Sequence, residues 1–535
     1  MTTERAAARP RGSRIAHAAA LIAVLTLVSR VAGFARTLVL GETVGYTHLA
    51  DMYQTANTIP NIVFEIVAGG ALAALVVPLL TGDLDRDDRA AVGATASALL
   101  SWVLVVLVPV ALLVVVLADP VMALLAPGRS ADQQAVGAGM LRIFAPQLPL
   151  YGVGIVLTGV LQAHRRFAWP VLAPLLSSLT VIGAYLTYGA VEPHQPDIPA
   201  VGRTGQLVLA VGTTVGVVVL SLCLVPAVRR LGLPWRPTLR LADGQRRAVR
   251  ELVWVGVLTV AAQQLTTALT IALVNWRTGG GALIQFNQAQ TVYLLPWAVL
   301  AVPVATSAYP ALASASAAGD LDRFRRTLAG ATRGVLLLSG LGAAALAWPF
   351  AWTYAWVAHS PGQASGLAAG IAAFAPGLLG YGLFALHSRA LYAHRQNRAA
   401  AQATVLGWGA VAVLATILAL TLPVSVRVAA VAAANSAGML VLGAVMLGFV
   451  ARRCGTGALA GVGRAGAAAL LAGTLATLAG IAVRAALPAA TGWIAVAGTA
   501  LLSGIVVAVV FAGVALLVDR RDAGALLGRL RGGRA

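Results

Sequence analysis

Residues Ala94–Ala118 read ATASALLSWVLVVLVPVALLVVVLA, a run without a single charged side chain. A helix rises about 1.5 Å per residue, so about 20 apolar residues span the hydrocarbon core of a bilayer. Lipid admits only helices and closed barrels, and this run lacks the polar–apolar alternation of a barrel strand. The stretch therefore predicts a membrane-spanning helix.

Similar runs recur along the whole chain. Of its 535 residues, 59% are hydrophobic and only 10% are charged, whereas a soluble protein needs a largely polar surface. The sequence therefore predicts an all-α, polytopic membrane protein with about fourteen transmembrane helices. The expected spans are 15–40, 50–80, 90–118, 135–163, 169–188, 206–226, 252–275, 282–312, 331–357, 365–392, 399–422, 427–450, 464–486 and 490–518.

The formal net charge is +20, which in a soluble protein would suggest nucleic-acid binding. Here the basic residues gather in short loops, where they set the topology of a membrane protein. With a cytoplasmic N-terminus, most of the 38 basic residues fall on the inside. We therefore expect both termini in the cytoplasm of a cell inner membrane protein, with no nucleic-acid partner. The arginines expected outside are Arg129, Arg142, Arg203, Arg277, Arg427 and Arg484.

Two segments of the chain resemble each other. FAPQLPLYGVGIVLTGVLQAHRR begins at Phe144 and FAPGLLGYGLFALHSRALYAHRQ begins at Phe374, so FAP, YG and AHR recur at an offset of 230. The string GDLDR also recurs, at Gly82 and Gly319, with an offset of 237. These offsets cover six predicted helices, an even number, so we expect two parallel six-helix repeats. Transporters built from repeats place the substrate near the bilayer midplane between two lobes.

This repeat gives a predicted domain organisation. We expect a cytoplasmic tail at 1–14, an N-lobe at 15–228, a basic linker at 229–251, a C-lobe at 252–450, an additional helix pair at 464–518 and a cytoplasmic tail at 519–535.

Two arginines fall within the first predicted span. A charge within a membrane costs about 2.5–3.5 kcal/mol on insertion scales, so Arg30 and Arg36 should line an aqueous cavity. For Arg36, snorkelling to the outer interface is the alternative. Guanidinium groups bind phosphate oxygens in a bidentate manner, so the two side chains suit an anionic headgroup such as a diphosphate.

The second predicted span carries a polar stripe, and the eighth carries an uncharged polar cluster. The stripe steps by three or four residues, which places its members on one face of a helix. Such a face lines a substrate path or, alternatively, forms a polar seam against the first span. The candidate substrate-binding residues of the two spans are Asp51, Gln54, Thr58, Asn61, Glu65, Gln290 and Thr291.

The sequence contains no Walker A, GxSxG or HExxH motif and no histidine cluster. We therefore expect a transporter and not an enzyme, with no catalytic residue, no metal and no cofactor.

The run SRVAGFARTLVLG at 29–41, followed by Ala50-Asp51 and by IPNIVFEIVAGGALAALVVPLL at 59–80, resembles the MurJ/MviN family of lipid II flippases in the MOP superfamily. The resemblance implies export of undecaprenyl-diphosphate-linked peptidoglycan precursor from the inner to the outer leaflet. It matches family positions to Arg30, Arg36 and Asp51. The chain departs from the family at Phe64-Glu65 and at Thr291, where arginines are usual.

The form NIVFE resembles actinobacterial members, here without their pseudokinase extension. Three other functions remain open on this evidence. They are a flippase for another polyprenyl-linked glycan, an ion-coupled solute exporter of the superfamily, and a non-transporting scaffold for cell-wall synthesis proteins.

Overall fold

The computed structural model of the chain describes residues 11–66, 72–240, 243–347, 351, 361–487 and 493–524. All regular elements in this part of the chain are helices. Eleven of the helices are long and apolar enough to cross a membrane, or twelve when the bent pair at 365–374 and 377–393 counts as one span. The all-α, multi-pass class is confirmed, whereas the number of fourteen spans stays a prediction.

The chain divides into two compact units. Unit 1 comprises Met1–Ala123 and Ser130–Val257, and unit 2 comprises Leu124–Arg129 and Leu258–Ala535. The predicted lobe boundaries at 229–251 and 450 stay predictions.

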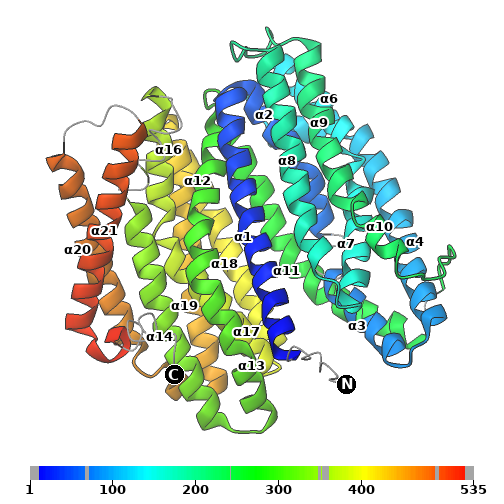
Figure 1. Ribbon diagram of the computed structural model, residues 1–535. Helices are drawn as coiled ribbons and strands as arrows, with labels where there is room; N and C mark the ends of the chain where they lie inside the picture. The colour runs from blue at the N-terminus through cyan, green and yellow to red at the C-terminus, as the bar shows by residue number, and fades with distance from the viewer. Residues whose placement is uncertain are drawn as a thin grey trace, which may run out of the picture. The chain divides into compact units, whose positions relative to one another are not determined.

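The helices that begin in unit 1 are α1 (Arg11–Thr43), α2 (His48–Phe64), α3 (Leu72–Asp85), α4 (Arg89–Val116), α5 (Ala118–Leu125), α6 (Ala131–Phe144), α7 (Gln147–Ala163), α8 (Ala168–Val191), α9 (Arg203–Leu222), α10 (Val225–Arg229) and α11 (Asp243–Asn275). Within this unit α1 packs on α8, and α8 packs on α9 (Figure 1). α2 packs on α6 and α7, which leaves one of its faces uncovered by them.

Unit 2 contains α12 (Ala282–Pro296), the π-helical turn η2 (Trp297–Ala301), α13 (Val302–Ala317), α14 (Leu321–Ala345), α16 (Pro361–Phe374), α17 (Gly377–Ala393), α18 (Asn397–Thr421), the 3₁₀ turn η4 (Val424–Val426), α19 (Arg427–Cys454), the 3₁₀ turn η5 (Thr456–Leu459), α20 (Val462–Ala486) and α21 (Trp493–Val518). Its buried centre is apolar and includes Phe324, Leu386 and Met446.

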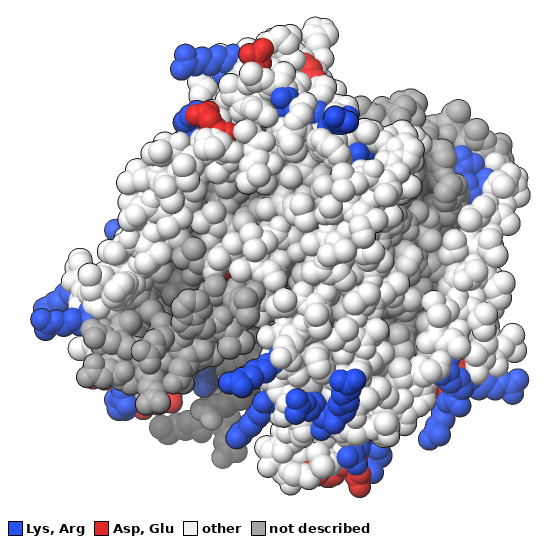
Figure 2. Space-filling view, turned by 180° about the vertical axis from the view of Figure 1, so that it is seen from behind, with Lys and Arg blue, Asp and Glu red and all other residues white. Residues whose placement is uncertain are grey.

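Charged side chains gather near the ends of the helices. On the face shown in Figure 2, basic and acidic residues lie in separate groups, with large areas of other residues between the groups. This distribution is typical of a protein whose helix middles contact hydrocarbon.

The structure confirms the internal repeat at the level of individual helices. α6 and α7 span 131–144 and 147–163, and α16 and α17 span 361–374 and 377–393, so the bounds recur at an offset of 230. In each pair the break falls at an Ala-Pro step, because proline removes a backbone donor. Arg165 and Arg395, one residue past the shared His, both have left-handed backbones, with φ of 58° and 57°.

The prediction that the two GDLDR strings are equivalent is wrong in register. Gly82 lies within α3, whereas Gly319 forms the left-handed turn before α14, with a φ of 70°. The equivalent turn in unit 1 is at Asp87, with a φ of 53°. The following residues, Asp88 and Asp320, each cap the next helix through a side-chain oxygen. The turn geometry therefore recurs at an offset of 232 residues. The offset of 237 between the two GDLDR strings differs from it by five residues.

The predicted additional helix pair, α20 and α21, packs together and against α14 (Figure 1). Charges at its end reinforce the packing. Arg333 of α14 lies 2.7 Å from Asp522, and Arg464 of α20 lies 3.2 Å from Asp519. The Asp519 side chain is wholly buried. Loss of a partner from a buried ion pair destabilises more than loss of an exposed pair.

We therefore expect Asp519→Asn to lower the thermal unfolding midpoint of the purified protein, equivalent to about 1–3 kcal/mol. Asp322→Asn is the matched control, since its carboxylate is 78% exposed and lies 3.6 Å from Arg325. Intrinsic fluorescence during heating measures both variants. Equal midpoints for the two variants would contradict a role of the buried pair.

Candidate functional site

The polar stripe lies on the open face of α2. Gln54, Thr58 and Asn61 are half-buried and Glu65, directly after the helix, is exposed, whereas Tyr53 on another face is buried. Thr58 donates a hydrogen bond to the Gln54 carbonyl at 2.7 Å, and Asn61 donates to the Asn57 carbonyl at 3.0 Å. These four residues thus share accessibility to solvent, and their role in lining a substrate path stays a prediction.

Asp51 differs from the rest of the stripe because it is completely buried. It lies in the first turn of α2, where its backbone N–H donates to the Thr47 carbonyl at 3.2 Å. A negative charge is favourable at this end of a helix. Asp51 therefore lies at the closed end of the stripe, and Glu65 lies at the exposed end.

Arg36 is the more enclosed of the two candidate arginines of α1. It is half-buried, and its charge acts on the hydroxyls of Tyr53, Tyr151 and Tyr185, which come from α2, α7 and α8. The Tyr53 hydroxyl also lies 2.7 Å from that of Tyr185 and 2.8 Å from the Thr213 hydroxyl. Proximity to this buried phenol cluster favours an interior position over snorkelling to a membrane interface.

Arg30 lies on a different part of α1. Its side chain is exposed, in a stretch where Leu27 and Val31 are also exposed. The two arginines are therefore in different surroundings, although both belong to one helix.

The candidate residues of unit 2 lie on α12. Gln290 and Thr291 are half-buried, and the Thr291 hydroxyl donates to the Asn287 carbonyl at 2.8 Å. The part of unit 2 that the structure describes thus carries an uncharged counterpart of the stripe on α2. Arg389 on α17 is half-buried and donates to the Ala385 carbonyl at 2.6 Å.

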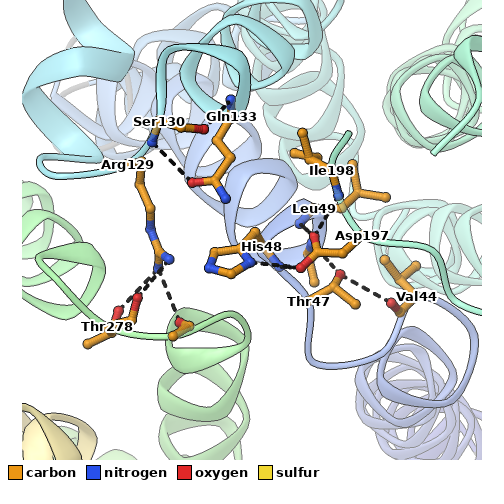
Figure 3. A network of polar contacts seen from close by, with 12 residues as sticks. Val44, Thr47, His48, Leu49, Arg129, Ser130, Gln133, Asp197, Ile198 and Thr278 are labelled. Carbon is orange, nitrogen blue, oxygen red and sulfur yellow. Dashed lines mark hydrogen bonds and ion pairs between the residues drawn. The ribbon is translucent and has the colours of Figure 1, made fainter. Parts of the chain in front are cut away.

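The start of α2 is held by a carboxylate that the sequence analysis missed. Asp197, in the loop after α8, accepts hydrogen bonds from the backbone N–H groups of His48 and Leu49, both at 3.1 Å (Figure 3). Its Oδ2 also lies 2.7 Å from Nδ1 of His48. The contact joins residues 149 positions apart, so no local pattern could have indicated it.

These hydrogen bonds change the acidity of Asp197. Burial by itself would raise the pKa of the carboxyl. The hydrogen bonds from the His48 side chain and from the backbone of His48, Ile198 and Leu49 favour the ionised form, so the pKa falls below the ordinary value of 3.8. The ionised carboxylate therefore stabilises the N-terminus of the helix that carries the stripe.

Two buried arginines were also missed, because the sequence analysis treated them as loop charges that set topology. Arg129 and Arg427 are 8% and 3% exposed.

Among the described residues, no group of three or more His, Cys, Asp or Glu side chains is arranged to bind a metal ion.

The family model described as lipid II flippase MurJ matches residues 40–510. The chain belongs to the MurJ family. It is 28% identical to the lipid II flippase MurJ of Burkholderia cenocepacia over 60% of its length and 61% of that relative. It is 24% identical to the probable lipid II flippase MurJ of Haemophilus influenzae, over 70% of this chain and 75% of that relative.

Solved structures agree with this MurJ assignment at the level of the fold. A lipid II flippase MurJ in an inward closed conformation aligns with a TM-score of 0.73 at 17% identity, over 94% of this chain and 99% of that one. An inward-facing MATE family multidrug transporter of the MOP superfamily aligns with a TM-score of 0.67 at 13% identity, over 82% of this chain and 98% of that one. The fold of the chain is thus shared with a structure described as a multidrug transporter.

We expect Asp197→Ala to destabilise this MurJ homologue by about 1–2 kcal/mol at neutral pH, because α2 loses its capping acceptor. Because the folded-state pKa is lowered, this contribution is complete above the ordinary value of 3.8 and is lost as the pH falls through the folded-state pKa. Thermal unfolding of wild type and variant at several pH values measures the difference.

Asp132→Ala is the control for Asp197→Ala, since Asp132 is an exposed residue of the first turn of α6. The assigned role of the carboxylate would be contradicted if the thermal unfolding midpoints of wild type and Asp197→Ala differed by the same amount in strong acid as at neutral pH.

Proposed function

We propose that this chain translocates lipid II, the undecaprenyl-diphosphate-linked peptidoglycan precursor, from the inner to the outer leaflet. The observation that carries the proposal is Arg36, a half-buried cation within the first predicted span whose charge acts on the phenol cluster of unit 1. A charge within a membrane-spanning helix is costly, so its retention points to a functional site. The match to the MurJ family over 40–510 supports lipid II as the substrate.

In this proposal Arg36 and Arg30 bind the diphosphate. Each guanidinium presents paired donors that match two phosphate oxygens, and hydrogen bonds between ions are about twice as strong as neutral ones. Gln54, Thr58 and Asn61 offer amide and hydroxyl groups to the polar sugar and peptide. Within unit 2, Gln290 and Thr291 on α12 offer groups of the same kinds.

The two acidic residues of the α2 region would assist release. A carboxylate competes with phosphate for a guanidinium, so Asp51 and Glu65 can stabilise the arginines once the headgroup leaves. Transport then requires binding and a change of access, with no covalent step. We therefore assign the chain as a transporter, with no catalytic residue, metal or cofactor.

The proposed orientation places both termini in the cytoplasm of the inner membrane. The positive-inside distribution of arginines supports this orientation, and the parallel repeat supports alternating access by movement of the two repeats. The membrane and the lipid-linked substrate are the proposed partners, together with cell-wall synthesis proteins.

A second candidate is a scaffold that retains the fold and recruits envelope-synthesis proteins without transport. It is favoured by Glu65, an exposed carboxylate where the family pattern has an arginine. The same substitution also keeps open another polyprenyl-linked glycan or a soluble solute as the cargo.

We expect Arg30→Ala and Arg36→Ala each to abolish growth of a strain that depends on this chain for lipid II export. Loss of charge-assisted hydrogen bonds worth about 1.5–3 kcal/mol should weaken headgroup binding roughly tenfold or more. Arg389→Ala is the matched control, because this arginine bonds a carbonyl of its own helix. Normal growth of both α1 variants at equal membrane abundance would exclude their proposed role.

Reconstitution separates the transporter from the scaffold. In proteoliposomes with fluorescent lipid II, the wild type should move the label between leaflets, and Arg36→Ala should not. Access of the label to a membrane-impermeant quencher measures movement. A wild type that supports growth but moves no label would favour the scaffold, and movement of a different labelled glycan would reassign the cargo.

A further inference from the structure

Arg427 is a buried arginine at the start of α19 in unit 2, far along the chain from the proposed lipid II site. Only 3% of its surface is exposed. Its guanidinium carbon lies 5.1 Å from the ring centroid of Trp276, near the end of α11. This packing holds the side chain inside the unit and fixes its direction.

The guanidinium lacks compensation within unit 2. Its Nε and Nη1 atoms are buried without a hydrogen-bond partner among the described residues. The sequence has no acidic residue at 252–319 or at 323–518. The remaining carboxylates of unit 2 are Asp320, Asp322, Asp519 and Asp522. Asp320 caps α14, and Asp519 and Asp522 pair with Arg333 and Arg464, so none of these three is available to Arg427.

Further cationic groups lie near this end of α19. Arg427 is the first residue of α19, where the helix dipole also contributes positive charge, and no side chain caps this end. Arg129 donates to the carbonyl and the hydroxyl of Thr278, at 2.9 and 3.1 Å (Figure 3). Arg277 lies over the same Trp276 ring, 5.4 Å from its centroid. An unpaired cation in such surroundings is costly unless an anion binds.

Arg427 lines a cavity of about 430 Å³ that is formed by residues of unit 2. This volume falls within the range of small-molecule sites, about 300–1,000 Å³. The polar groups of its wall are mainly donors or hydroxyls, from Thr278, Gln285, Ser365 and Ser425. Val428 and Ala429, in the first turn of α19, also line it.

We propose that this cavity binds a phosphoryl group, with Arg427 as its principal ligand. The fork of a guanidinium matches phosphate oxygens, and a helix N-terminus adds further attraction for an anion. The site goes beyond the proposed lipid II site, which rests on α1 and α2 of unit 1. It lies at the end of α19 that the arginine distribution predicts to be extracytoplasmic.

The phosphoryl group has two possible sources, an anionic lipid headgroup and soluble phosphate. Val424 and Val426 line the cavity and also expose 39% and 43% of their surface. Apolar side chains at the rim suit a ligand whose tail enters the bilayer. The chemistry at Arg427 is the same for both sources, and the experiment distinguishes them.

The test uses the purified full-length protein. One arm measures the thermal unfolding midpoint against inorganic phosphate, with sodium chloride at equal ionic strength as reference. The other counts retained lipids by native mass spectrometry after purification from phosphatidylglycerol or phosphatidylcholine nanodiscs. A ligand that binds only the folded state raises the midpoint. A response to phosphate indicates the soluble source, and selective retention of phosphatidylglycerol indicates the lipid.

Arg427→Gln should lower the affinity for the ligand that the wild type binds, phosphate or phosphatidylglycerol, about tenfold or more. This loss is expected when charge-assisted hydrogen bonds are removed. Arg484→Gln is the charge-matched control near the end of α20 and should bind like the wild type. Ala369→Leu is the second variant, since this exposed alanine lines the cavity and a larger side chain fills it while Arg427 stays. It should also abolish binding.

Three results would overturn the proposal. The first is no response of the wild type in either arm. The second is a response that Arg427→Gln leaves unchanged. The third, if Arg427→Gln cannot be purified, is undiminished binding by Ala369→Leu.

Discussion

Hydrocarbon does not solvate charge, and this constraint determines where each ionised group of the chain lies. A buried charge needs an opposite charge, hydrogen bonds, water or a ligand. The buried Asp519 has Arg464, and the half-buried Asp197 has His48 and three backbone N–H groups. Arg427 has only the face of Trp276 among the residues that the structure describes. The difference between compensated and uncompensated charges separates structural residues from candidate ligand-binding residues.

The two halves of the repeat share a backbone but differ in chemistry. α1 and α11 have the same length, from 11 to 43 and from 243 to 275, so positions 30 and 36 correspond to Ala262 and Ala268. The charges of the first half are therefore absent from the second. Unit 2 instead concentrates its buried cations, Arg129 and Arg427, beside the loop that follows α11. A duplicated scaffold has thus acquired two different electrostatic patterns.

Much of this organisation could be predicted from the sequence because membranes impose strong regularities. Apolar runs predict the helices, and the spacing of Gln54, Thr58 and Asn61 predicts that they share the open face of α2. Features that depend on the burial of a side chain, or on contacts between residues far apart in the sequence, could not be predicted. A loop arginine has the same sequence signal whether it is solvated, as Arg277 is, or buried, as Arg427 is. The cap that Asp197 provides depends on a loop that returns from α8, which no local pattern encodes.

The register error in the repeat has a related cause. GDLDR matches as a string, but helix ends are set by where a left-handed residue and a capping carboxylate occur together, as at Asp87-Asp88 and Gly319-Asp320. Gly82 lies inside α3 and has no such role. Backbone geometry therefore defines the equivalence of two repeats more reliably than identical letters do.

The end of α2 carries an aromatic and an acidic residue where the family resemblance implied arginines. Phe64 packs against Tyr151, with ring centroids 5.2 Å apart, in the place of a cationic side chain. Glu65 is exposed and adds a negative charge at the same end of the stripe. An anionic headgroup would be repelled there and attracted toward α1, so a diphosphate clamp in unit 1 would depend on Arg30 and Arg36 alone. Glu65 also makes the electrostatic potential along α2 asymmetric. The positive charge of Arg36 acts on the phenol cluster beside Tyr53, and the negative charge of Glu65 acts at the opposite end of the helix.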